Sequence, residues 1–416
     1  MIKRLFVALS LVASLVSYAQ EGSSSPYSFY GLGETRFKGT AENRSMGGIS
    51  FFPDSIHMNL QNPAFYPGLK LTGLSLGASY NTTNLKTNAD ESKARRTTLD
   101  YLAVAIPMGK FGAGFGLMPY TSVGYKIQSI NYDTSPAQLR KYQGSGGLNK
   151  AFLGAGYQIT KKLSVGAEFG YYFGSIETSS IASIQDVQYG TRELDDSKAN
   201  GPGLNLGLAY NSKVGKKLTF SAGLTYSPQT KLVFNNERKI ATIQFLSTGT
   251  RVVEEENVDV ANTSVKMPAK FTFGAGIGEM KKWMIGAGAT FSQSADMGNR
   301  FADIEGAEFK NGMKVNVGGY YIPNYASFTD YWKRVTYRAG LIYEDTGLVL
   351  NDKNIKDAGM TLGLGLPLGG TFSNINFGFE YGKRGTRDAG LVEENYVNFT
   401  LGLSFNDRWF VRRKYD

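Results

Sequence analysis

Apolar and polar residues alternate along most of the chain from about residue 70 onward. Leu74, Leu76 and Ala78 alternate with glycine and serine, and residues 397–405 repeat the pattern near the C-terminus. Successive side chains of a strand point to opposite faces of a sheet. Each run therefore predicts a strand with one apolar face and one polar or glycine-rich face.

The alternation predicts fourteen strands joined by connectors that are in turn short and long. The strands are expected at 70–81, 97–108, 110–127, 148–160, 162–176, 200–211, 216–229, 266–278, 281–293, 312–323, 334–345, 357–367, 372–383 and 395–406. The long loops are expected at 82–96, 128–147, 177–199, 230–265, 294–311, 346–356 and 384–394. Short turns at one rim, long loops at the other and an even strand number are typical of outer-membrane barrels.

The composition of the two strand faces separates a membrane barrel from a soluble sandwich. Aromatic residues lie towards the ends of the apolar faces, as girdles at the membrane interface would. The opposite faces carry glycine, serine, threonine and asparagine, with an occasional charge such as Glu168, Arg338 or Glu380. The predicted fold is all-β: a 14-stranded antiparallel transmembrane β-barrel over residues 70–406, whose closure satisfies every strand edge.

The first residues have the pattern of a secretory signal peptide. Lys3 and Arg4 precede an apolar stretch, residues 5–16, and a small-x-small site at 17–19. This stretch is too short to span a bilayer as an anchor, so we expect residues 1–19 to be cleaved before Gln20.

Residues 20–69 precede the first strand and do not alternate. They are rich in glycine, serine, asparagine and proline, yet they include Phe51, Phe52 and Met58. A flexible leader would not need these apolar residues. We therefore expect the segment to fold back into the barrel as a hatch, or plug, inside the lumen.

Composition excludes several kinds of chemistry. The chain has 416 residues, no cysteine, one histidine and a formal charge of +10. Disulfides, thiol catalysis, Cys-ligated metals and His-rich metal sites are thus excluded. His57 has no evident serine or acidic partner, so we expect a packing residue and predict no enzyme, catalytic residue, cofactor or metal.

The charged residues do not indicate nucleic-acid binding. Lysines are scattered over the predicted short turns rather than grouped with aromatic residues on one face. The acidic residues Glu254, Glu255, Glu256 and Asp259 lie in a predicted long loop. We interpret them as a solvated acidic run, with a surface cation site as the alternative.

Two short motifs lie ahead of the first predicted strand. Ser45-Met46-Gly47-Gly48 and Asn62-Pro63-Ala64 resemble the N-terminal hatch of the FadL family of outer-membrane long-chain fatty acid and hydrocarbon transporters. Residues 100–120, 265–271 and 337–345 resemble its second and third, middle and late strands. The resemblance is diffuse but runs along nearly the whole mature chain. The ending Asp407-Arg408-Trp409-Phe410, within a basic tail at 407–416, resembles outer-membrane proteins of Bacteroidota.

The resemblance implies a mechanism of passive transport. Met46, Gly47, Gly48, Asn62, Pro63 and Ala64 would belong to the hatch. Ligand would bind among the outer loops, pass inside and leave sideways into the bilayer through a kink in the third strand. The candidate kink is Gly116, Leu117, Met118, Pro119 and Tyr120. Proline cannot donate to a strand ladder, although Pro119 would equally suit a strand that simply ends there.

The predicted function is transport of hydrophobic small molecules across the cell outer membrane by a monomer whose partners are its ligand and the surrounding lipid. Two alternatives stay open: a FadL-like accessory or cap protein of a type IX secretion assembly, and a polar diffusion porin. Few charges lie on the predicted lumen faces, which disfavours the porin.

Overall fold

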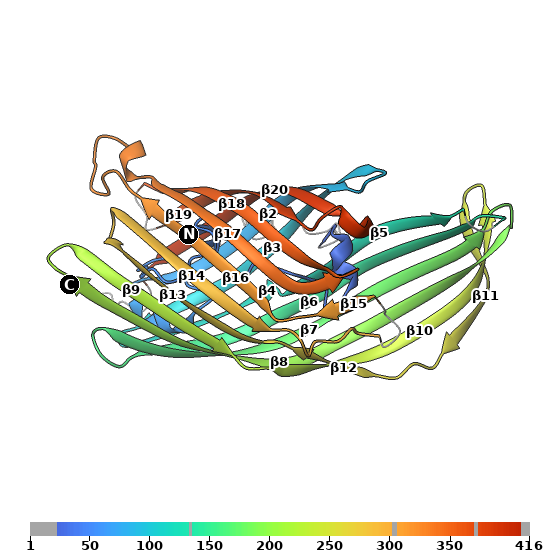
Figure 1. Cartoon of the computed structure of the whole chain (residues 1–416). Helices are drawn as coiled ribbons and strands as arrows, with labels where there is room; N and C mark the ends of the chain where they lie inside the picture. The colour runs from blue at the N-terminus through green and yellow to red at the C-terminus, as the bar shows by residue number, and fades with distance from the viewer. Residues whose placement is uncertain (1–22, 133–134, 302–305, 370–372, 409–416) are drawn as a thin grey trace, which may run out of the picture.

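The structure is a computed structural model, and it describes residues 23–132, 135–301, 306–369 and 373–408. The predicted signal peptide, residues 1–19, and most of the basic tail lie outside these ranges. Almost all regular structure in the described residues is strand (Figure 1). No helix in these ranges is long and apolar enough to cross a membrane.

Fourteen strands form the wall of a closed antiparallel barrel. They are β2 (Thr72–Lys86), β3 (Glu91–Met108), β4 (Phe111–Pro119), β6 (Gln138–Gln158), β7 (Leu163–Ile184), β8 (Tyr189–Val214), β9 (Leu218–Ser227), β13 (Ala269–Glu279), β14 (Trp283–Gln293), β16 (Gly312–Tyr321), β17 (Thr336–Leu350), β18 (Lys353–Pro367), β19 (Asn374–Arg384) and β20 (Glu393–Asp407). Each pairs with the next in this order, and β20 closes the ring by pairing with β2 over residues 72–86. The predicted 14-stranded antiparallel barrel is confirmed.

Several predicted long loops are wrong, because the strands continue through them. Residues 128–147, 177–199 and 230–265 are mostly strand, and β6, β7 and β8 are 21, 22 and 26 residues long. About 9–11 residues suffice for a strand to cross a bilayer. Beyond that length the outward face meets water instead of lipid and need not be apolar, whereas inward residues such as Ile176, Leu232 and Phe234 are still buried. The hydrophobic alternation is lost although the backbone ladder continues.

These long strands form what we call the outer extension, an open sheet beyond one half of the barrel (Figure 1). Its order is β5 (Thr121–Asn131), β6, β7, β8, β10 (Thr230–Leu246) and β11 (Gly249–Val258). The short β12 (Thr263–Met267) pairs with the beginning of β10 and leads into β13.

β15 (Ala307–Phe309) pairs with the end of β17. Short 3-10 turns, η3 (Trp332–Arg334) and η4 (Asp388–Gly390), lie in two connectors.

Residues 23–69 form the N-terminal segment, which has little regular structure. It contains η1 (Pro26–Phe29), β1 (Glu34–Thr35), α2 (Ala41–Arg44) and η2 (Pro63–Gly68). Its apolar residues, including Ile49, Phe51 and Tyr66, are buried against the inner face of the wall. The segment therefore occupies the barrel interior, and the contacts it makes there define the candidate site.

Candidate functional site in the barrel interior

The N-terminal segment touches the wall where the wall carries glycine. A side chain added at Gly112 would collide with the Tyr66 carbonyl, one at Gly274 with the Phe51 ring, and one at Gly318 with Met46. Similar contacts occur at Gly156, Gly166, Gly207, Gly223, Gly286, Gly340, Gly363, Gly378 and Gly402. These glycines come from twelve of the fourteen wall strands, from β4 round to β20. The lumen-facing glycines therefore make room for the segment on nearly every side.

Residues Met46, Gly47 and Gly48 dock on one part of this ring. Gly47 and Gly48 have φ angles of 68° and 86°, a conformation that glycine adopts without strain. The Gly47 amide donates to the Thr361 hydroxyl at 2.9 Å, and its carbonyl accepts from the Asn316 side chain at 2.9 Å. The backbone of the segment is thus hydrogen-bonded directly to polar side chains of β18 and β16.

Residues Asn62, Pro63 and Ala64 dock on a different part of the ring. The Asn62 side chain accepts from the Ala64 amide at 3.0 Å and caps η2. Its amide group also donates to the Leu208 carbonyl of β8 at 3.2 Å. The two motifs that resemble a hatch therefore lie at separate attachment points of one segment, and Ala64 is almost completely buried.

The wall ladder is interrupted at the candidate kink. The pairing of β3 with β4 begins where Met108 lies opposite Phe111 and stops where Leu102 lies opposite Leu117. Strand β4 then ends at Pro119. Gly116 lies in the paired part, Leu117 faces outward, and Met118 and Tyr120 are buried. β5 begins at Thr121 and continues along β6, but in the described residues it does not pair with β3. The first half of β3 therefore has no wall partner on that side.

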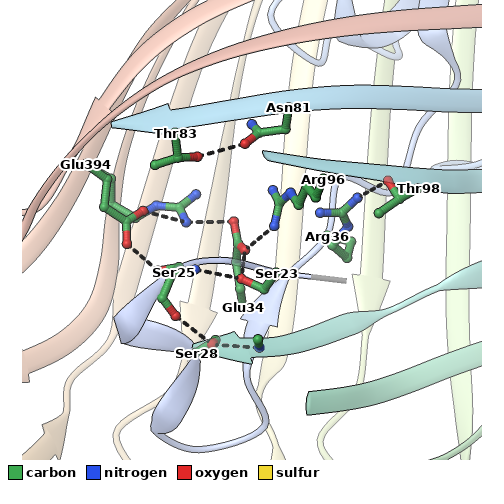
Figure 2. Close-up of polar contacts among 12 residues, drawn as sticks. Ser23, Ser25, Ser28, Glu34, Arg36, Asn81, Thr83, Arg96, Thr98 and Glu394 are labelled. Atoms are coloured by element: carbon green, nitrogen blue, oxygen red, sulfur yellow. Dashed lines mark hydrogen bonds and ion pairs between the residues drawn. The ribbon is translucent and has the colours of Figure 1, made fainter. Parts of the chain in front are cut away.

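Strand β1 of the N-terminal segment pairs with the edge of β5 that β3 does not pair with. Glu34 and Thr35 pair with Ser122 and Thr121, and the Arg36 amide donates to the Tyr120 carbonyl at 3.0 Å. Figure 2 shows the side chains of Glu34 and Arg36 close to those of β3. We call this interruption, with β1 beside it, the strand break.

Side chains of β1 and its neighbour Arg36 bridge the strand break to β3. Glu34 pairs with Arg96 of β3 at 2.9 Å. Arg36 donates to the Thr98 hydroxyl at 2.5 Å (Figure 2). It also lies 3.4 Å from the Asp100 carboxylate. Where the backbone ladder stops, ion pairs and hydrogen bonds from the N-terminal segment connect the two sides.

Glu34 is also the centre of a wider buried network. Its carboxylate pairs with Arg384 of β19 at 2.7 Å, and Arg384 contacts Asp357 of β18 at 2.8 Å. The Ser25 hydroxyl donates to Glu394 of β20. Burial by itself would raise the pKa of Glu34, but Arg96, Arg384 and Arg36 hold it well below the usual range of a carboxyl group. Glu34 is therefore ionised.

A second buried network holds α2. Arg44 pairs with Glu380 of β19 at 2.7 Å and lies 3.7 Å from Asp100. Elsewhere on the wall Lys150 pairs with Glu168, and the Arg338 guanidinium donates to Asn376 at 2.9 Å. The isolated charges noticed on the predicted lumen faces therefore each have a buried partner, and in the case of Glu380 that partner comes from the N-terminal segment.

His57 does have acidic partners, so the expectation that it lacks them is wrong. Its Nδ1 lies 2.8 Å from the Asp54 carboxylate and its Nε2 lies 3.5 Å from that of Glu42. Burial disfavours the charged imidazole, but these two carboxylates outweigh that effect and raise the pKa of His57 above its ordinary value. The sequence could not reveal Glu42, which lies 15 residues away on α2.

A cavity of about 400 Å³ lies between the N-terminal segment and the wall. Its apolar lining includes Leu32, Phe51, Leu60, Met118, Tyr120, Tyr172, Met267 and Phe309. Its charged lining includes Glu34, Lys38, Arg44, Lys150, Lys270, Lys314 and Arg384. Because Met118 and Tyr120 line it, the cavity extends to the strand break. Lys38, whose Nζ lies 3.8 Å from the Tyr120 ring centroid, has its pKa held well below the usual range by burial and by nearby lysines.

The described residues contain no group of three or more acidic or histidine side chains that could hold a metal ion. The acidic run Glu254–Glu256, which falls on β11 rather than in a loop, belongs to no such group. The polar groups around the cavity, within the part of the chain that the structure describes, are therefore ion pairs and hydrogen bonds rather than a cluster of metal ligands.

Comparison with known proteins places the chain among barrel structures of one kind. A family model described as BamG matches residues 1–416. The toluene transporter TodX of Pseudomonas putida is 17% identical, with a TM-score of 0.60 over 90% of this chain and 100% of that one. The Ralstonia pickettii toluene transporter TbuX is 16% identical, with a TM-score of 0.59 over 89% and 99%. A FadL homologue of Pseudomonas aeruginosa is 14% identical, with a TM-score of 0.57 over 91% and 99%. No curated protein matches the chain.

Proposed function

The chain belongs to the BamG family, and we propose that it is an outer-membrane channel for small hydrophobic molecules, such as fatty acids or hydrocarbons. The fold that it shares with two toluene transporters supports this proposal. The wall strands close into a ring that is interrupted at the strand break, and the outward side chains of that wall are largely apolar, as a bilayer requires.

The observation that carries the proposal is the position of the cavity. It lies between the N-terminal segment and the wall, and Met118 and Tyr120 bring it to the strand break. A hydrophobic molecule in the cavity would be next to the strand break, where β5 does not pair with β3 in the described residues. We propose that the segment acts as the hatch and that residues Gly116–Tyr120 mark a lateral exit into the bilayer.

Deleting residues 21–66 tests the hatch. The variant and the intact chain are reconstituted in liposomes, and uptake of radiolabelled toluene and oleate is measured. We expect uptake to be lost while the barrel still assembles, which a heat-dependent shift in gel mobility reports. Unchanged uptake would overturn the hatch-gated model. Mass spectrometry of small molecules extracted from the purified chain would identify the ligand.

A second function is favoured by a different observation. The outer extension projects far beyond what a membrane wall needs, so the chain also suits an accessory subunit of a larger outer-membrane assembly, such as a type IX secretion assembly. Stable co-purification with a larger barrel, and no uptake by the intact chain, would support this function. A polar porin suits the interior less well, because the N-terminal segment contacts nearly every wall strand.

A further inference from the structure

The outer extension ends on strand β11, and one edge of this strand is unpaired in the part of the chain that the structure describes. Residues 249–258 pair with β10 and with no other described strand. All ten residues are exposed. A strand edge in water presents free amide and carbonyl groups that can pair with another extended chain.

The side chains of β11 give this strand a net negative charge. Glu255 is engaged by Arg192 at 3.3 Å and by Lys239 at 3.5 Å. Glu254 and Glu256 lie opposite Thr242 and Ile240 and form no ion pair with any described residue. Two carboxylates on one face of the free strand are therefore left without cations.

Apolar side chains accompany these carboxylates. Val252 is 40% exposed, Val253 54% and Val258 36%. A strand added to the edge would cover part of this surface, so hydrophobic burial would add to the backbone hydrogen bonds.

We propose that the free edge of β11 binds an extended segment rich in lysine or arginine from another protein, by strand addition. A second copy of this chain would set glutamates against glutamates, which disfavours self-association. Within the described residues, the end of β20 at Asp407 pairs with Thr72 and does not reach β11. This interaction does not depend on what passes through the barrel.

The test uses the full-length chain in detergent and two fluorescent nine-residue peptides. One alternates threonine and lysine, and the other alternates threonine and glutamate. We expect the lysine peptide to bind and to slow hydrogen exchange of residues 249–258, with roughly tenfold weaker binding of the glutamate peptide. Equal binding of the two peptides, or binding without protection of β11, would overturn the proposal.

Two variants separate edge pairing from simple charge attraction. Leu246 and Gly249 flank the two-residue turn 247–248 and face each other as a hydrogen-bonded pair. From Gly249 onward, residues alternately direct their backbone groups towards β10 and away from it. The Val252 amide is one of those that point away, towards the free edge. Val252→Pro removes that donor, and we expect it to abolish protection and binding. The double variant Glu254→Gln and Glu256→Gln should weaken binding roughly tenfold.

The matched control is Glu237→Gln, on β10 beside Lys198, and it should change binding less than about twofold. Full binding by the proline variant would contradict strand addition. If that variant does not fold, the exchange pattern of the intact chain still decides.

Discussion

Glu34 of the N-terminal segment and Arg384 of wall strand β19 form a partly buried ion pair of 2.7 Å. They are 350 residues apart in sequence, and the same Glu34 carboxylate reaches Arg96 across the strand break at 2.9 Å. One carboxylate thus joins two distant wall strands through a segment that is not part of the wall. The position of the segment therefore depends on charge as well as on packing.

Replacing Glu34 by glutamine should loosen the segment. Arg96 and Arg384 would then lose the carboxylate that they share, while Arg384 would keep Asp357 and Glu394. Removing one partner of a fully buried ion pair costs about 3–5 kcal/mol, and the cost is lower for a partly buried pair such as this one. We expect hydrogen exchange of residues 23–36 to accelerate by more than about tenfold, while exchange in the wall strands β13 and β14 is unchanged.

The matched control is Glu237→Gln, which removes a solvent-exposed partner of Lys198. Exposed ion pairs contribute little, so we expect no change in the exchange of residues 23–36. Equal exchange in Glu34→Gln and the unmodified chain would show that packing alone holds the segment.

Enlarging a wall glycine should displace the segment without breaking the barrel. A side chain at Gly274 would collide with the Phe51 ring, so Gly274→Leu forces that ring out of its site. Overpacking of this kind costs about 1–3 kcal/mol. We expect greater protease cleavage within residues 45–60 but an assembled barrel on gels. Gly298→Ala is the control, since an added Cβ there meets open space. Cleavage equal to that of the control would refute the contact.

The pKa of His57 should report the attachment of the segment. Asp54 and Glu42 raise it, so the imidazolium stabilises the folded segment fully at pH values below the ordinary pKa of histidine. This contribution is lost as the pH rises through the raised value. The chain has one histidine, so its NMR titration is unambiguous. We expect Asp54→Asn to lower the midpoint, and an unchanged midpoint would contradict the assigned pair.

The sequence predicts the wall well because one physical rule governs it. Side chains that face lipid must be apolar and those that face the lumen need not be, so fourteen runs of alternation correspond to fourteen wall strands. The rule fails in the outer extension, where the outward face meets water instead of lipid and need not be apolar. Residues 177–184, for example, continue β7 without any apolar face.

The interior is predicted less completely, because its contacts join residues far apart in the chain. Glu168 and Glu380 could be singled out as charges on otherwise uncharged faces, which is the signal of a buried partner. Glu34, Arg96 and Arg384 carry no such signal, since each lies where the alternation has ended or has not begun. Only the closed barrel brings their strands around one carboxylate.

A reversible cross-link between β1 and β5, beside the strand break, would test whether the segment must move for transport. Thr35 of β1 and Thr121 of β5 are register partners, and the chain has no cysteine of its own. Cysteines at these two positions are close enough in an antiparallel pair for a disulfide. If ligand leaves sideways through the break, the oxidised variant should lose most uptake of toluene and oleate, and reduction should restore it.

The control places the same cross-link within the wall. Thr272 and Thr290 are register partners on β13 and β14, and their hydroxyls lie 2.9 Å apart. These two strands are already paired along their full length, so a disulfide there restrains nothing that transport needs to move. Uptake by this control should be the same in its oxidised and reduced forms. Full uptake by the oxidised Thr35–Thr121 variant would mean that ligand passes without displacing β1, and the exit would then have to lie elsewhere in the wall.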